Sequence, residues 1–510
     1  MPVADRPPTR NQYFATKSLK LLLEEAEGDG ENRLRRILGP VQLTALGIGA
    51  IIGAGIFVAT GAAAHNVAGP SLMLSYVVAG ITCVFAALCY AEFAAMVPVA
   101  GSAFTYAYAT LGELFAWIIG WDLVLEYAVG SATVATGWSG YFQNVLAKFG
   151  IHVPKLLSES PWKYNAVTGG FDSTGSFINL PAVIIVIIIT AVLVKGIQES
   201  ANFNAAMVGI KVAAVLFVIG VGAFFIEKAN WDPFAPYGWT GISFFGHHVA
   251  GQVSPTGEPR GMLAGAAIIF FAYIGFDSVS THTEEAKNPK RDVPIGIITS
   301  LVVCTILYIL VVAVLTGMVK YNQLDTAAPV SQAFAQKGVG WAEGLIAAAG
   351  VAGITSVLLV MMLSGPRVFL AMARDGLVPK SIFGVVHPKF RTPWKSTIVV
   401  GIFVILLAGF LPIDALLHLT NIGTLFAFVI VCAAVLIMRR THPEAARPFR
   451  CPMVPLVPIL GILMCLLLMF SLPAANWLRL LAWLLLGFAI YFFYGRHHSV
   501  IRKQMESGEV

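Results

Sequence analysis

Apolar stretches long enough to cross a lipid bilayer occupy most of this 510-residue chain, and they constrain its fold more than any other feature. Hydrophobic residues make up 57% of the chain and charged residues only 12%, against roughly 25% charged in soluble domains. A membrane-spanning helix needs about 20 predominantly apolar residues. Twelve stretches approach or exceed that length, which predicts an all-α polytopic membrane protein. They lie near residues 41–65, 70–97, 114–147, 181–196, 202–226, 262–283, 294–317, 341–371, 396–412, 415–438, 452–473 and 477–495.

Lysine and arginine are distributed unevenly between the loops on the two sides of the predicted membrane. The polar first 38 residues lack the apolar core and cleavage site of a secretory signal peptide, so we expect them to stay in the cytosol. With that start, the cytoplasmic segments hold 24 of the 33 Lys/Arg and the external loops hold 8. Such an excess is typical of cytoplasmic loops. It predicts a protein of the cytoplasmic membrane with both termini cytoplasmic. The net charge of +6 then reflects this topology, and we expect no nucleic-acid partner.

Several classes of site are missing from the sequence. All six cysteines lie in or at the edge of predicted spans, so we expect no structural disulfide. No CxxC or histidine-rich cluster suggests a metal site, and nothing predicts a cofactor. No Ser/His/Asp set, metal pair or phosphate-binding loop stands out, so we do not expect an enzyme.

One lysine, Lys211, stands inside an otherwise apolar stretch at 203–225. An ammonium group at that depth costs about 3 kcal/mol on insertion scales, so it needs internal partners or a task. The alternative is a side chain that snorkels to the nearer membrane interface. Lys211 is therefore the first candidate for a functional residue.

Two spans are interrupted by glycine, the first at residues 47–55 and the sixth at 271–277. Each opens a block of five spans, and because five is odd, the second block enters the membrane from the opposite side. Paired glycine-interrupted segments in an inverted repeat point to a binding site at the midplane. The predicted units are a cytoplasmic segment 1–38, a first repeat 39–226, a second repeat with its preceding external loop 227–438, two further spans 439–497 and a cytoplasmic tail 498–510.

The physical reason for such a site lies in the backbone. Unwound backbone inside a bilayer is tolerated only where it is buried in protein or lines a cavity. Free N–H groups at the start of a half-helix bind an anion, and free carbonyls at the end of one bind a cation. A broken helix that offers both suits a zwitterion. The alternative is that these glycines form a helix-packing seam.

Motifs along nearly the whole chain from about Leu38 resemble the cationic amino acid transporter branch of the amino acid, polyamine and organocation superfamily. With twelve spans, the chain is similar to a prokaryotic member. The resemblance implies the LeuT-type fold of five-plus-five inverted repeats. The motifs are 48–61 (IGAIIGAGIFVATG), 87–108 (ALCYAEFAAMVPVAGSAFTYAY), 119–130 (IGWDLVLEYAVG), 271–298 (FAYIGFDSVSTHTEEAKNPKRDVPIGII), 367–379 (RVFLAMARDGLVP), 421–440 (NIGTLFAFVIVCAAVLIMRR) and 494–499 (YGRHHS).

The resemblance also implies where a substrate binds. It places the substrate carboxylate on the backbone of the first break and the α-amino group on carbonyls of the second. Phe271 would close over the substrate from outside, although simple packing is the alternative for one phenylalanine among 33. The implied binding residues are Ile51, Gly53, Ala54 and Gly55 for the carboxylate, and Ile268, Phe271 and Ile274 for the amino group.

Two further residues bear on the substrate side chain. Glu126 lies about twelve residues into the third span, near the midplane at 1.5 Å per residue, and either faces the substrate or joins a polar network. Met361 occupies the corresponding place in the eighth span. A thioether offers little to replace the hydration of a lysine or arginine substrate. We therefore expect small neutral amino acids such as alanine, with arginine and lysine as the alternative substrates.

A cation site is implied beside Lys211. In sodium-coupled members of this fold the cation lies between the first broken helix and eighth-span hydroxyls, here Thr355 and Ser356. In proton-coupled members a fifth-span lysine resembling Lys211 puts its ammonium there. Burial disfavours a charged lysine, so gain and loss of its proton would bias the inward and outward states. The alternative is a permanent charge that stabilises the occluded state. Asp277 either titrates with transport or caps the second half-helix.

Acidic residues near the cytoplasmic ends of the spans suggest an inner gate. Glu92, Glu284 and Glu285 would form ion pairs with Arg367 and Arg374. The alternative is that these charges are solvated and only set topology. Phe271 would be the corresponding outer gate.

Together these features predict a secondary active transporter of L-amino acids that works by alternating access, with the proton as coupling ion. We expect a monomer in membrane lipid, and an accessory membrane subunit stays an open alternative. An ion channel would need a continuous polar lining, whereas these spans carry isolated polar points. A second rival is an amino acid sensor that keeps the fold without flux.

Overall fold

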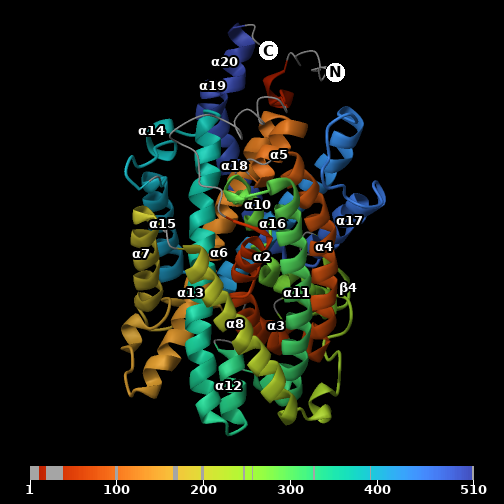
Figure 1. Cartoon of the computed structure of the whole chain (residues 1–510). Coiled ribbons are helices and arrows are strands. Elements are labelled where there is room, and N and C mark those ends of the chain that lie inside the picture. Colours follow the sequence, from red (N-terminus) through yellow and green to blue (C-terminus); the bar gives the residue numbers. More distant parts are fainter. Residues whose placement is uncertain are drawn as a thin grey trace.

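The chain forms a bundle of long helices, with short helices at both ends (Figure 1). The structure is a computed structural model, and it describes residues 11–18, 38–97, 102–164, 170–196, 200–244, 247–255, 257–324, 328–390 and 392–507. Side chains of residues 164, 200–205, 284, 418 and 419 lie outside that description. Most of the predicted segment 1–38 and the last three residues of the tail lie outside it as well.

The apolar stretches form the helices of the bundle. Within the described residues, eight helical stretches are long and apolar enough to cross a membrane, and one of them, Pro40–Met96, contains the first two predicted spans. Three shorter apolar helices coincide with the fourth, ninth and eleventh. The prediction of an all-helical polytopic membrane protein is confirmed. The apolar helices are α2 (Pro40–Ile51), α4 (Leu72–Met96), α6 (Glu113–Lys148), α7 (Leu180–Lys195), α8 (Ser200–Gly222), α9 (Met262–Ile269), α11 (Pro289–Met318), α13 (Gly340–Arg374), α15 (Trp394–Phe410), α16 (Ile413–Thr441), α17 (Leu456–Phe470) and α18 (Ala474–Ile490).

Shorter elements connect these helices. Three antiparallel two-stranded hairpins lie in the two longer loops. The short helices are α3 (Thr60–Ala63), α5 (Ser102–Thr110), α10 (Ser278–Thr281), α12 (Pro329–Gln336), α14 (Lys380–Phe383), α19 (Arg496–His498) and α20 (Val500–Ser507). The strands are β1 (Trp162–Tyr164), β2 (Phe171–Ser173), β3 (Ile242–Phe244), β4 (His247–Ala250), β5 (Gln252–Val253) and β6 (Pro259–Arg260).

Both glycine-rich spans are interrupted where the sequence predicts. The first ends as α2 at Ile51 and resumes as a wide helical turn at Gly55–Ala59 before α3. The sixth ends as α9 at Ile269, and α10 begins at Ser278. Between them Gly275 has φ +121°, a conformation that side chains with a Cβ rarely adopt. Each span is therefore two half-helices joined by irregular backbone.

The two longest helices, α6 and α13, pack against each other, while α11 packs on α2 and α4. Residues 11–18 lie at the end of the bundle that carries α19 and α20, because Gln12 donates a hydrogen bond to the Arg496 carbonyl. We call this end the terminal face; α12 lies at the opposite end (Figure 1). The division into inverted repeats at 39–226 and 227–438 stays a prediction.

Candidate functional site

The two broken spans meet each other at their breaks. A Cβ added to Gly55 would lie 2.3 Å from the Cα of Ala272, and one added to Gly275 would lie 2.9 Å from the carbonyl oxygen of Ala50. Only glycine permits backbones to approach this closely. These two glycines therefore serve packing, as the seam alternative proposed, and they bring the two breaks together.

Tyr308 on α11 joins the two breaks through one hydroxyl. Its oxygen lies 2.7 Å from the carbonyl oxygen of Ile51 and 3.1 Å from that of Ala272, and it donates to both. A carbonyl freed by a helix break needs such a partner when it is buried. Sequence analysis did not single out Tyr308, because an isolated tyrosine in an apolar span carries no signal of its partner.

The first break also leaves donors free. In the described part of the chain, neither the N–H of Gly53 nor that of Ala54 donates a hydrogen bond. These two amides follow the end of α2 and precede the turn that begins at Gly55, which is the position implied for a substrate carboxylate. Free N–H groups at the start of a half-helix suit an anion.

The carbonyls implied for the amino group are already partly occupied. Asn421 on α16 donates from its amide nitrogen to Ala267 and Ile268, at 2.9 and 2.8 Å, and the Phe271 carbonyl accepts the N–H of Ile274 at 3.2 Å. Each carbonyl retains a second lone pair for a ligand. The Phe271 side chain is buried at the break. Asn421 was not anticipated from the sequence.

Glu126 lies in a buried polar region between α6 and the second break. Its side chain is beside Thr424 of α16 and within electrostatic reach of Asp277, and one of its oxygens has no hydrogen-bond partner among the described residues. Asp277 accepts the hydroxyl of Tyr127 at 2.6 Å and the N–H of Gly275 at 3.2 Å. Asp277 directly precedes α10, and whether it titrates with transport or caps this helix stays a prediction.

Met361 lies close to the third span, as the neutral-substrate hypothesis requires. A Cβ on Gly130 would lie 3.2 Å from its sulfur and 3.8 Å from a methyl group of Thr420. Gly130 is one turn beyond Glu126 on α6, so the thioether and the carboxyl group border neighbouring parts of one region.

Lys211 is fully buried, with 0% of its surface exposed, and the snorkelling alternative is wrong. Its ammonium donates to the carbonyl of Gly49 on α2 at 2.6 Å. Its methylene stem packs on α13, where a Cβ on Gly353 would lie 3.2 Å from the Lys211 Cγ. The lysine therefore connects the first, fifth and eighth spans.

The two eighth-span hydroxyls have other partners. Thr355 accepts the indole N–H of Trp138 at 2.8 Å and donates to the carbonyl of Val351 at 2.7 Å. Ser356 donates to the carbonyl of Gly353 at 3.3 Å. Among the described residues, no hydrogen bond joins either hydroxyl to Lys211. Both lie on α13, which Lys211 contacts through its stem.

The expected inner gate forms only in part. Arg367 pairs with Glu285 at 2.7 Å. The expected pairing of Glu92 with Arg367 is wrong, because Glu92 accepts two hydrogen bonds from Arg439, at 2.9 and 2.7 Å. Arg447 also pairs with Glu92, at 3.3 Å between Nε and Oε1. The side chain of Glu284 lies outside the described residues.

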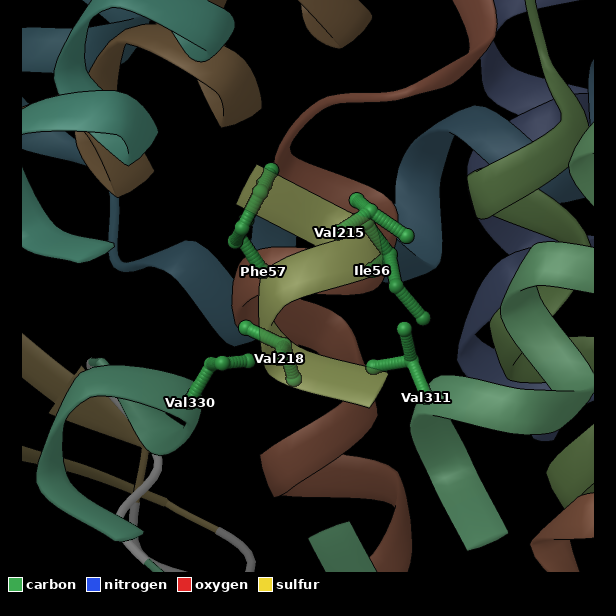
Figure 2. Close-up of a pocket in the computed structure, with 6 residues that line it drawn as sticks. All are labelled: Ile56, Phe57, Val215, Val218, Val311 and Val330. Atoms are coloured by element: carbon green, nitrogen blue, oxygen red, sulfur yellow. The ribbon is translucent and has the colours of Figure 1, made fainter. Parts of the chain in front are cut away.

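A small apolar cavity lies just beyond the first break (Figure 2). Side chains from the first span, α8, α11 and α12 line it. A zwitterion would find no polar partner there. The lining residues are Ile56, Phe57, Val215, Val218, Val311 and Val330.

Two helix breaks in contact inside an apolar bundle, with free amides on one of them, are an arrangement that would suit the binding site of a membrane carrier. A sequence model of the family described as amino acid permease matches residues 38–491. The chain belongs to this family. The permease is therefore an amino acid transporter and not an enzyme.

Relatives of the permease match it over nearly its whole length. The branched-chain amino acid permease BcaP of Bacillus subtilis is 46% identical over 97% of this chain and 100% of its own. The methylthioribose transporter of the same bacterium is 42% identical over the same shares. The vacuolar cationic amino acid transporter 4 of Arabidopsis thaliana is 30% identical over 93% of this chain and 94% of its own. The predicted resemblance to the superfamily that includes the cationic transporters is confirmed.

Proposed function

We propose that this permease is a proton-coupled secondary active transporter of neutral L-amino acids that works by alternating access. It would lie in the cytoplasmic membrane with the terminal face inward, an orientation supported by the excess of Lys/Arg in the segments predicted to be cytoplasmic. The transported amino acid would bind at the two helix breaks as a zwitterion. Its carboxylate would accept the N–H groups of Gly53 and Ala54.

The observation that carries this proposal is the pair of free amides at a break held against a second break. Gly55 and Gly275 keep the breaks in contact, and Tyr308 satisfies a carbonyl on each. Two donors are then left at Gly53 and Ala54, and these suit a carboxylate. The amino group would use the second lone pairs of the Ile268 and Phe271 carbonyls.

The substrate side chain would point toward Met361 and Gly130. These residues give that side of the site an apolar surface, which supports neutral substrates. The relatives are named for a branched-chain amino acid, methylthioribose and cationic amino acids, so family membership alone does not fix the substrate. We propose alanine and other small neutral amino acids, with arginine and lysine excluded by the cost of desolvating their charge.

Lys211 would provide the coupling. Its ammonium group binds the Gly49 carbonyl of the first span, and its stem packs on Gly353 of the eighth span. The side chain therefore acts as a covalently attached cation between these two spans. Loss of the proton would weaken this contact and favour release of the first span. Opening toward the terminal face would also require the Arg367–Glu285 pair to separate.

Uptake of labelled alanine into proteoliposomes tests the proposal. An inward proton gradient should stimulate uptake by the natural chain and not by Lys211→Ala, while Lys389→Ala, at an exposed lysine, serves as the matched control. Unlabelled valine, serine and glycine should compete, whereas arginine and lysine should not. Counterflow separates the alternatives, because a carrier exchanges, a channel dissipates and a sensor does neither. Equal stimulation of the natural chain and Lys211→Ala would refute the coupling role.

A further inference from the structure

Asp122 is a buried carboxyl group to which no described residue donates a hydrogen bond. It is 1% exposed, and neither of its oxygens has a hydrogen-bond partner within the described residues. It belongs to α6, four residues before Glu126, so both point to similar sides of that helix. Asp122 is the nearer of the two to Glu113, where α6 begins at the terminal face.

The structure makes room for this carboxyl group without giving it a donor. It faces Gly423 of α16, where an added Cβ would lie 2.6 Å from Oδ1 and 3.0 Å from Oδ2. Glu126 is the titratable group that interacts with Asp122. Across the described residues of α5, α7, α13, α15, α16 and α18, which pack on α6, no charged side chain does so.

An aspartate with only a structural role in a membrane helix is expected to have a donor or a cation beside it. An unpartnered carboxylate would lose its hydration without compensation, so this conformation favours the neutral acid that holds a proton. Carboxyl groups of this kind within spans mark proton pathways. Asp122 therefore calls for an explanation beyond packing.

The neighbours of Asp122 lead to the helix breaks. Glu126 is about 6 Å further along α6, at 1.5 Å per residue. It interacts with Asp277 at the second break, and Asp277 is fixed by the hydroxyl of Tyr127. Three carboxyl groups thus follow one another from the break toward the terminal face.

We propose that Asp122 is a proton-binding site through which the proton of the Glu126 carboxyl group leaves toward the terminal face. When the terminal side opens, water takes the proton from the Asp122 carboxylic acid. The Glu126 carboxylic acid then passes its proton to the resulting Asp122 carboxylate, which leaves Glu126 as a carboxylate. This proposal rests on the proposed proton-coupled function. It adds a proton exit site that is separate from the two helix breaks where the substrate would bind.

Replacing Asp122 by its neutral isostere tests the proposal. A gradient of one pH unit supports about tenfold accumulation for one proton per substrate, since 1.4 kcal/mol is a factor of ten. We expect Asp122→Asn to lose this accumulation and to keep alanine counterflow, which needs no net proton movement. Asp122→Glu should restore part of it. Asp172→Asn, in an exposed hairpin strand, is the matched control.

Three outcomes are decisive. Normal gradient-driven accumulation by Asp122→Asn would overturn the proposal and leave the proposed function intact. Absence of gradient stimulation in the natural chain would instead refute the proposed coupling itself. If Asp122→Asn also loses counterflow, infrared spectroscopy of the natural protein decides: a protonated-carboxyl carbonyl band that is shifted by Asp122→Glu supports the proposal, and the lack of such a band overturns it.

Discussion

The ammonium nitrogen of Lys211 on α8 lies 2.6 Å from the carbonyl oxygen of Gly49, two residues before α2 ends at its break. The contact joins residues 162 positions apart in the chain. Because the lysine stem also packs on Gly353 of α13, one side chain holds three spans around the first break. The predictions below concern this contact and the others that fix the breaks.

Replacing Lys211 by methionine keeps the packing of its stem and removes the charge. We expect loss of gradient-stimulated uptake and a lower apparent unfolding temperature in detergent, because a hydrogen bond from a charged group contributes about 1.5–3 kcal/mol. Uptake assays and thermal unfolding measure the two effects. An unchanged unfolding temperature would argue against the Gly49 contact.

Gly55→Ala should disable the site, because its Cβ would lie 2.3 Å from the Ala272 backbone. The breaks would have to separate, and we expect alanine uptake to fall about tenfold or more, the effect of 1.4 kcal/mol. Gly344→Ala is the matched control, since a Cβ there meets nothing within 4 Å. Similar uptake by the two variants would contradict the close approach of the breaks.

Tyr308→Phe should weaken substrate binding while the protein stays folded. The change removes the donor shared by the carbonyls of Ile51 and Ala272, and an unsatisfied buried acceptor costs about 1–3 kcal/mol. Alanine binding by isothermal titration should weaken accordingly. Tyr321→Phe, at a partly exposed tyrosine, should bind as the natural chain does.

The terminal face should lose stability when its buried ion pair is broken. Lys17 pairs with Asp375 at 2.8 Å, and both side chains are nearly buried. Lys17→Met would remove this cation from the nearly buried Asp375 carboxylate, and we expect a lower unfolding temperature. A double-mutant cycle with Asp375→Asn, followed by thermal unfolding, measures the coupling. Additive effects of the two changes would show that the pair contributes nothing.

The Arg367–Glu285 pair should not account for pH dependence near neutrality. Burial alone would raise the pKa of Glu285, but the Arg367 guanidinium and His282 together hold it below its ordinary value. The stabilisation from a lowered carboxyl pKa is complete above the unfolded value of about 4.3 and is lost as pH falls through the folded value. Glu285→Gln, which removes the titrating carboxyl group, should therefore change alanine uptake by the same factor at pH 5.5 and 7.5. A factor that differs between these values would contradict the intact pair.

Local features of the sequence were enough to predict the helical spans and their two breaks. Apolar length alone predicts the spans, since a bilayer requires it wherever the span packs. Glycines predict both breaks, because a backbone without Cβ adopts angles such as φ +121° at Gly275 at little cost. The cost of a buried ammonium singles out Lys211 before any partner is known.

The sequence by itself determined the helical membrane bundle, its two interrupted spans and the buried charge of Lys211. Only the tertiary structure decided the partners: Arg439 for Glu92, Trp138 for Thr355, Tyr308 for both breaks and, among the described residues, no hydrogen-bond donor for Asp122. The physical reason is the distance along the chain over which each feature acts. Hydropathy and glycine act within one helix, whereas a hydrogen bond between spans depends on which helix faces pack together, and this packing joins residues hundreds of positions apart.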